Sequence, residues 1–263
     1  MHSLLDHLPA KERRGSKPRC HLLTHGSQEQ VAARLTGLID PWGQVNPHDK
    51  WMPQGFDDLK EAQLHDAPQL LADSIRTKLQ SWWLAVPVRA TTPNWDIAST
   101  CTIDGKGGLL LIEAKGHDTE LLREEKGKTL DKGASENSRR NHDRIGKAIG
   151  EAKVALNSIL PGWNLSRDSH YQLANRFAWG WKLIELGLPV ILVYLGFLNA
   201  EEMRDLGKPF AADVDWQRLV RSHSKALVPD GIWNQKWELY GQPFIPLIRS
   251  IEWPLDTPPE NDA

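Results

Sequence analysis

The chain has 263 residues, of which 40% are hydrophobic and 25% are charged, and its formal net charge is -2. These values are typical of a globular protein and exclude a general electrostatic attraction to nucleic acid, so any basic surface has to be local. The two cysteines, Cys20 and Cys101, cannot build a disulfide framework or a cysteine-rich zinc site, which favours a cytoplasmic protein. The longest apolar run, near residues 188–198, is too short to span a bilayer, and we expect no membrane partner.

The first 30 residues carry basic side chains without an apolar period. Two interpretations are equally open for residues 1–30, a flexible basic arm or a terminus of no consequence. Prolines mark loops in the stretch that follows, at positions 41, 47 and 53. Because no repeat or low-complexity linker interrupts it, we expect residues 31–263 to form a single domain, with a core over about 60–197 and a C-terminal elaboration over 198–263.

The first predicted elements are a helix and three strands. Asp66 at the N-cap and Pro68 in the first turn predict a helix through Trp83, with Leu71, Ile75 and Leu79 on its apolar face. The strands are predicted at 84–90, 95–103 and 109–115.

Two helices and a buried strand follow a long polar segment. The first helix begins at Ser135 or Ser138 and runs to about Ile159, and the second is capped near Ser166 or Asp168 and ends at Gly187. Residues 189–197 are uniformly apolar, as in a strand with parallel neighbours. A helix near 213–223 and a last strand near 246–253 complete the chain. This order predicts an α/β fold with a mixed central sheet flanked by helices.

The hairpin between residues 95 and 115 carries three charged side chains. Asp104-Gly105 is typical of a two-residue type I′ turn, which pairs residue i with residue 209 − i. Asp96 then lies opposite Glu113, and Lys115 points to the same face. A four-residue turn keeps all three on one face, whereas a three-residue turn moves Asp96 to the other.

Opposed carboxylates repel each other unless one is protonated, a cation such as Lys115 neutralises them, or a divalent ion lies between them. Mg²⁺ prefers oxygen ligands and is usually held by one or two carboxylates together with substrate phosphates. Lys115 would then hold or deprotonate a water molecule, or offset charge in the transition state. This pattern indicates attack of water on a phosphodiester.

Asp96, sixteen intervening residues and then Glu113-Ala114-Lys115 at the end of an apolar strand resemble the motif of the PD-(D/E)XK nuclease superfamily. The resemblance covers roughly residues 60–197 and implies a restriction-endonuclease-like αβββαβ core. It also implies Mg²⁺, with Mn²⁺ as a substitute, held by Asp96, Glu113 and the backbone carbonyl of Ala114, and Lys115 as the catalytic lysine. Two residues separate Pro93 from Asp96, so the first half of the motif is only approximate.

Further site residues are expected on two helices. Some members of the superfamily add an acidic ligand from the first helix, for which Glu61 is the candidate and Asp66 and Asp73 are rivals. RecB-type members carry a glutamine and, one turn later, an aromatic residue; this chain has Gln172 and then Arg176. These two side chains either point together at the catalytic site or at a phosphate, or form a merely polar helix face.

A local excess of basic side chains after the third strand is the candidate surface for backbone phosphates: Arg139, Arg140, Arg144, Lys147 and Lys153. His117 follows Lys115 on the same strand face, either as a phosphate contact or as a solvated loop histidine. His65, His142 and His170 lack the spacing of a zinc site, so none is expected.

The sequence therefore predicts a magnesium-dependent deoxyribonuclease of the restriction, repair or defence type, with DNA as its partner. Assembly as a homodimer or within a larger nuclease complex is left open. The alternative is a catalytically silent nucleic-acid-binding or assembly subunit of the same fold that contacts its partner through tryptophan-rich surfaces. A carboxylate-pair enzyme such as a glycoside hydrolase is disfavoured, because a cation beside the general acid lowers the pKa that such an acid needs.

Overall fold

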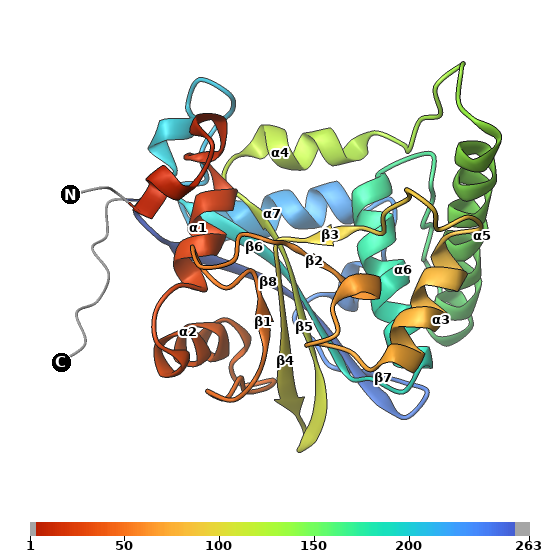
Figure 1. Cartoon of the computed structure of the whole chain (residues 1–263), viewed down its shortest axis with the longest axis horizontal. Coiled ribbons are helices and arrows are strands. Elements are labelled where there is room, and N and C mark those ends of the chain that lie inside the picture. Colours follow the sequence, from red (N-terminus) through yellow and green to blue (C-terminus); the bar gives the residue numbers. More distant parts are fainter. Residues whose placement is uncertain (1–3, 256–263) are drawn as a thin grey trace.

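A mixed six-stranded sheet runs through the centre of the computed structural model, which describes residues 4–255 (Figure 1). Its strands lie in the order β1 (Trp51–Met52), β4 (Ile97–Ile103), β5 (Lys106–Lys115), β6 (Val190–Leu198), β8 (Gln242–Glu252) and β7 (Trp237–Leu239). Strands β5, β6 and β8 are parallel to one another, and the remaining pairings are antiparallel. The predicted α/β class with a mixed central sheet is confirmed.

Helices cover both faces of the sheet, giving three layers (Figure 1). One face carries α1 (Ser16–Leu23) and α2 (Gln28–Ile39), and the other carries α3 (Asp73–Trp83), α5 (Glu136–Ile159), α6 (Tyr171–Glu185) and α7 (Asp213–Ser224). The short elements are β2 (Ala62–Gln63), β3 (Asn94–Trp95), α4 (Asp118–Leu122) and the 3₁₀ helices η1 (Leu4–His7), η2 (Ala10–Glu12), η3 (Leu64–Asp66), η4 (Arg123–Glu125), η5 (Glu201–Met203) and η6 (Asp230–Ile232). None of the helices within residues 4–255 has the length and apolarity needed to cross a bilayer.

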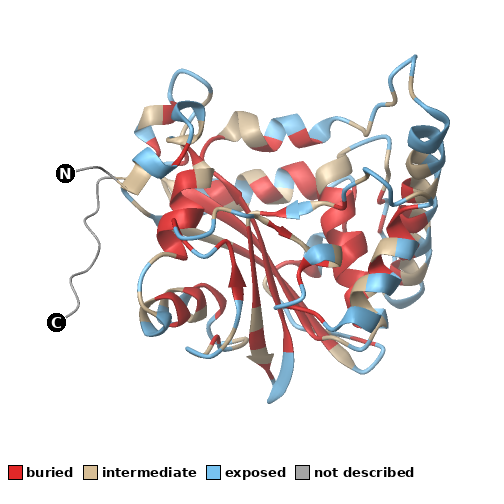
Figure 2. Ribbon diagram, viewed as in Figure 1, coloured by how far each residue is buried: buried red, intermediate tan, exposed pale blue. Residues whose placement is uncertain are grey.

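The sheet has one hydrophobic core on each face, and alternate side chains of β5 point into one core or the other. Leu109 and Leu111 pack with the helices of the α5 and α6 side, whereas Leu110 and Ile112 pack with α1 and α2. The central strands are buried along most of their length (Figure 2). Strand β6 lies between two parallel neighbours, as its continuous apolar run predicted.

The predicted hairpin register is confirmed. Asp104 and Gly105 both have positive φ, at 49° and 75°, as a type I′ turn requires. The ladder runs from Ile97 opposite Ile112 to Ile103 opposite Lys106, so each pair of numbers sums to 209.

The described part of the N-terminal segment differs from a flexible arm. Helix α1 is buried along most of its length, and its Arg19 donates two hydrogen bonds to the carboxylate of Glu202, at 2.5 and 3.1 Å. Helix α2, for which the sequence predicted no element, begins at a capping box formed by Ser27 and Gln30. The described part of this segment is therefore folded; residues 1–3 and 256–263 lie outside the described range.

The predicted strand over 84–90 is wrong. This stretch is irregular, and the backbone of Val86 forms its hydrogen bonds with the side-chain amide of Asn141 instead of a neighbouring strand. The edge of the sheet next to β4 is occupied by β1, which comes from earlier in the chain. Helix α3 also begins at Asp73 instead of following Asp66, because residues 67–71 form turns.

The helices and strands after residue 135 lie close to their predicted positions, but some of their ends and buried faces differ. Helix α5 is capped by Ser135, but Val154 and Ile159 are exposed, and the core side of the helix includes Ala152 and Leu156. Helix α6 begins after His170 instead of Ser166 or Asp168. Helix α7 and strand β8 lie where the sequence predicted a helix and a last strand.

Candidate active site

The hairpin places Glu113 and Lys115 on the sheet face that α6 covers, and Asp96 lies close to both. Leu111 of β5 belongs to the core of that face, and strand alternation puts Glu113 and Lys115 on the same side. Asp96 lies just outside the ladder, between β3 and β4, where its Oδ2 accepts a hydrogen bond from the backbone N–H of Ala114 at 2.7 Å.

Glu113 is the centre of the cluster and is only 1% exposed. Its Oε1 accepts hydrogen bonds from the ammonium of Lys115 and from Nε2 of Gln172, the latter at 2.5 Å. Its Oε2 accepts one from Nε of Arg176 at 2.7 Å. Gln172 and Arg176, one turn apart on α6, therefore both reach the predicted site residue, and Arg176 does not belong to a solvated helix face.

Arg176 joins α6 to the other site strands. Its Nη2 donates to the backbone carbonyl of Asn94 at 2.7 Å, and its guanidinium carbon lies 4.4 Å from the ring centroid of Trp95. The guanidinium is thus held by an ion pair, a backbone carbonyl and an aromatic face. As placed here, it binds a protein carboxylate and not the phosphate expected from the sequence.

Lys115 lies between two buried carboxylates. Besides Glu113, its Nζ is 2.8 Å from Oε1 of Glu124, which η4 supplies and which is 2% exposed. Burial alone would lower the pKa of the Lys115 ammonium, but Glu113, Glu124 and Asp96 outweigh it and raise the pKa above its ordinary value. Lys115 is therefore a charged hydrogen-bond donor. Glu124 was not predicted as a site residue, because it lies in a mixed-charge segment typical of a solvated surface.

Asp96 is poorly stabilised as an anion. Burial, followed by the charge of Glu113, raises the pKa of Asp96 to about 8, against the opposing effects of Lys115 and the Ala114 N–H. The two acids repel each other across the hairpin, as their opposed positions predicted. A divalent cation between them would relieve this repulsion.

Glu61 lies beside this pair, but not on the first helix. Strand β2 pairs with β3 so that Ala62 is opposite Trp95, and the next pair in this register is Glu61 with Asp96. Glu61 accepts a hydrogen bond from Nδ2 of Asn94 at 2.9 Å. Its rivals Asp66 and Asp73 are exposed and pair with Lys60 and Arg76, respectively.

Some of the predicted phosphate-binding side chains are exposed to solvent, and others already form hydrogen bonds within the protein. Arg140 and Lys147 are exposed on α5, whereas Arg139, although exposed, donates to the carbonyl oxygens of Lys132 and Ala134. Arg144 is half-buried and donates to the carbonyl oxygens of Ser81 and Trp82 at the end of α3. His117 is not on a solvated loop: it is 1% exposed and pairs through its backbone with Pro209.

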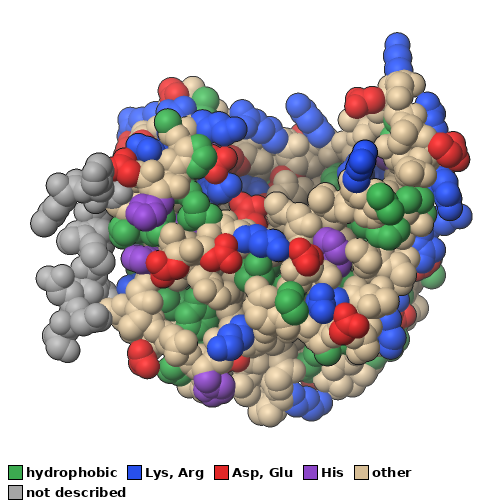
Figure 3. Space-filling model, viewed as in Figure 1, with side chains coloured by type: hydrophobic (Ala, Val, Ile, Leu, Met, Phe, Trp, Pro, Cys, Tyr) green, Lys and Arg blue, Asp and Glu red, His purple; other side chains and the backbone are tan. Residues whose placement is uncertain are grey.

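The upper edge of the molecule is hollowed between the N-terminal helices and the start of α5 (Figure 3). Lysine and arginine side chains stand on both flanks of this notch, and acidic side chains are visible below it. The notch is therefore flanked by positive charge.

No protein-family model, curated protein or solved structure matches this chain.

Proposed function

We propose that the protein is a metal-dependent nuclease that hydrolyses DNA phosphodiester bonds, built on the restriction-endonuclease-like fold of the PD-(D/E)XK superfamily. The observation that carries the proposal is the proximity of Asp96, Glu113 and Lys115 at one end of the β4–β5 hairpin. Under this proposal, α5, α6 and β6 supply the helix and strand that follow the three strands in the αβββαβ order. The strand next to β4 at the edge of the sheet is β1.

The donor set fits a magnesium ion. Asp96, Glu113 and the carbonyl of Ala114 offer oxygen ligands at the end of β5, with Glu61 as a further carboxylate. Burial and the charge of Glu113, which raise the pKa of Asp96, both favour a cation beside it. Mg²⁺, or Mn²⁺ in its place, supplies Lewis-acid polarisation of a phosphate when bound. Lys115, which stays charged between Glu113 and Glu124, offsets negative charge as the phosphodiester is attacked.

Cleavage of supercoiled plasmid and of single-stranded DNA tests the proposal directly. We expect cleavage in the presence of Mg²⁺ or Mn²⁺, none in EDTA, and a loss on the order of 100-fold or more for Lys115→Ala. Lys106→Ala is the matched control, since Lys106 is the exposed lysine at the opposite end of the same strand. Equal cleavage by the Lys115 and Lys106 variants would reject the assignment.

One observation favours a second candidate, a catalytically silent nucleic-acid-binding or assembly subunit. Both oxygens of Glu113 already accept hydrogen bonds from Lys115, Gln172 and Arg176, so the cluster is compensated without an ion. Salt-sensitive DNA binding without metal-dependent cleavage would support this candidate. Its expected tryptophan-rich surface is wrong: all twelve tryptophans are buried or half-buried.

A further inference from the structure

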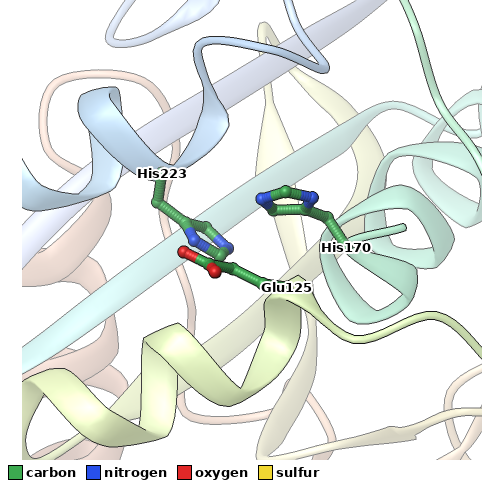
Figure 4. Close-up of side chains that lie close together, drawn as sticks. All are labelled: Glu125, His170 and His223. Atoms are coloured by element: carbon green, nitrogen blue, oxygen red, sulfur yellow. The ribbon is translucent and has the colours of Figure 1, made fainter.

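Three side chains from different parts of the chain converge outside the proposed magnesium site. Glu125 ends η4, His170 precedes α6 and His223 lies in the last turn of α7, and their side chains point into one space (Figure 4). One potential ligand atom from each lies within 4.8 Å of the other two. The imidazole rings of His170 and His223 have their centroids 4.9 Å apart.

His223 provides an independent reason to expect a ligand there. Its side chain is only 1% exposed, Nδ1 has no hydrogen-bond partner among the described residues, and Nε2 lies 3.5 Å from Oε2 of Glu124. A buried polar atom without a partner destabilises the folded state, and coordination of an ion would remove that cost. This imidazole is therefore available as a ligand.

The backbone already fixes the positions of the other two residues. The N–H of His170 donates to the carbonyl of Glu125 at 3.0 Å, and the N–H of Tyr171 donates to the carbonyl of Lys126 at 3.1 Å. Nδ1 of His170 is 2.7 Å from the hydroxyl of Ser169, which leaves Nε2 for an ion.

We propose that Glu125, His170 and His223 bind a divalent ion of the zinc class, separate from the proposed magnesium site. Two imidazoles and one carboxylate match the ligands that Zn²⁺ prefers, whereas Mg²⁺ prefers oxygen alone. Tetrahedral bonds of about 2.0–2.1 Å require ligand atoms roughly 3.3 Å apart, so the three side chains close inward slightly on binding.

The zinc-class site adjoins Lys115 through Glu124. Oε2 of Glu124 lies 3.5 Å from Nε2 of His223, while its Oε1 binds the ammonium of Lys115. Ion-binding histidines usually donate their second ring N–H to a carboxylate, and Glu124 is positioned for that role. The ion thus joins η4, α6 and α7, and it holds Glu124 against Lys115.

Titration of the metal-free chain with ZnCl₂, followed by calorimetry and by metal analysis after dialysis, tests the site. We expect one tightly bound ion per chain, tetrahedral Co²⁺ absorption bands on substitution, and a melting temperature that rises with Zn²⁺. His170→Gln and His223→Asn should each weaken Zn²⁺ binding by a factor of at least about 100. The exposed His48 supplies the control His48→Gln, which should bind as the wild type does.

Asp96→Asn separates this proposal from the nuclease assignment, because it should abolish magnesium-dependent cleavage and leave Zn²⁺ binding intact. His170→Gln, at a half-buried position, keeps the test valid even where His223→Asn does not fold. Unchanged Zn²⁺ stoichiometry and affinity in folded His170→Gln, or no binding by the wild type, would overturn the proposal.

Discussion

Arg176 of α6 donates a hydrogen bond through Nε to Glu113 of β5 at 2.7 Å, and both side chains are buried. This ion pair joins the helical layer to the strand that bears the proposed catalytic residues. Arg176 and Lys115 together compensate a carboxylate that would otherwise be buried without an opposite charge beside it.

Replacing Arg176 by methionine is expected to lower the free energy of unfolding by about 3–5 kcal/mol, because Glu113 loses a buried partner. Urea denaturation in EDTA measures this. The double variant Glu113→Gln/Arg176→Met should be more stable than the sum of the two single changes implies. Arg204→Met, at an exposed ion pair, should change stability by less than about 0.5 kcal/mol. If the stability losses of the two single variants simply add in the double variant, the pairing of Glu113 with Arg176 is rejected.

Glu124 is expected to act as a positioning residue for Lys115. Glu124→Gln keeps the shape but removes the charge that the ammonium contacts at 2.8 Å, so kcat should fall roughly 10- to 100-fold with little change in KM. Plasmid-cleavage kinetics measure both constants. The control is Glu185→Gln on α6, whose carboxylate pairs with Lys182 at the surface. A wild-type kcat in Glu124→Gln would remove Glu124 from the proposed mechanism.

The exposed cations of α5 are expected to bind backbone phosphates. Arg140→Gln/Lys147→Gln should weaken DNA binding and reduce the slope of log K against log salt concentration by up to about 1.8, or roughly 0.9 per contact. Fluorescence anisotropy at several salt concentrations gives the slope. Arg204→Gln/Arg218→Gln removes two exposed charges elsewhere and should leave the slope unchanged. An unaltered slope in the α5 variant would exclude this surface.

His21 is expected to make stability depend on pH. Burial lowers the pKa of His21 below its ordinary value of 6.5, although its Nδ1 lies 3.0 Å from the carbonyl of Gly55. As pH falls below about 6.5, the unfolded chain takes up the proton first, so the free energy of unfolding falls; above that pH the contribution is complete.

Urea denaturation at about pH 7.5 and about pH 5.5 tests this dependence. His21→Gln should lose less stability than the wild type over that interval, whereas the exposed His48→Gln should follow the wild type. The same loss in all three proteins would assign the pH dependence to other groups.

Local signals in the sequence were sufficient for the hairpin and for the later helices and strands. Asp104-Gly105 determines the turn, and the turn determines which residues oppose each other, so the relation of Asp96 to Glu113 followed from counting. The continuous apolar run of β6 likewise predicted its parallel neighbours.

The remaining features depend on contacts between distant segments. Strand β1 has only two residues, too few for a visible alternation, and residues 84–90 are apolar but find no partner strand. Glu124 and the cluster of Glu125, His170 and His223 come from segments that only the tertiary fold brings together. No local spacing rule describes such sites.

The six-stranded sheet ends in β1, with two residues, and in β7, with three. Such short borders present few free amide and carbonyl groups to another molecule, which discourages end-to-end fusion of sheets into continuous ribbons or fibrils. Main-chain pairing between copies of this protein at β1 or β7 is therefore disfavoured, and contacts through side chains of the helical layers are favoured instead.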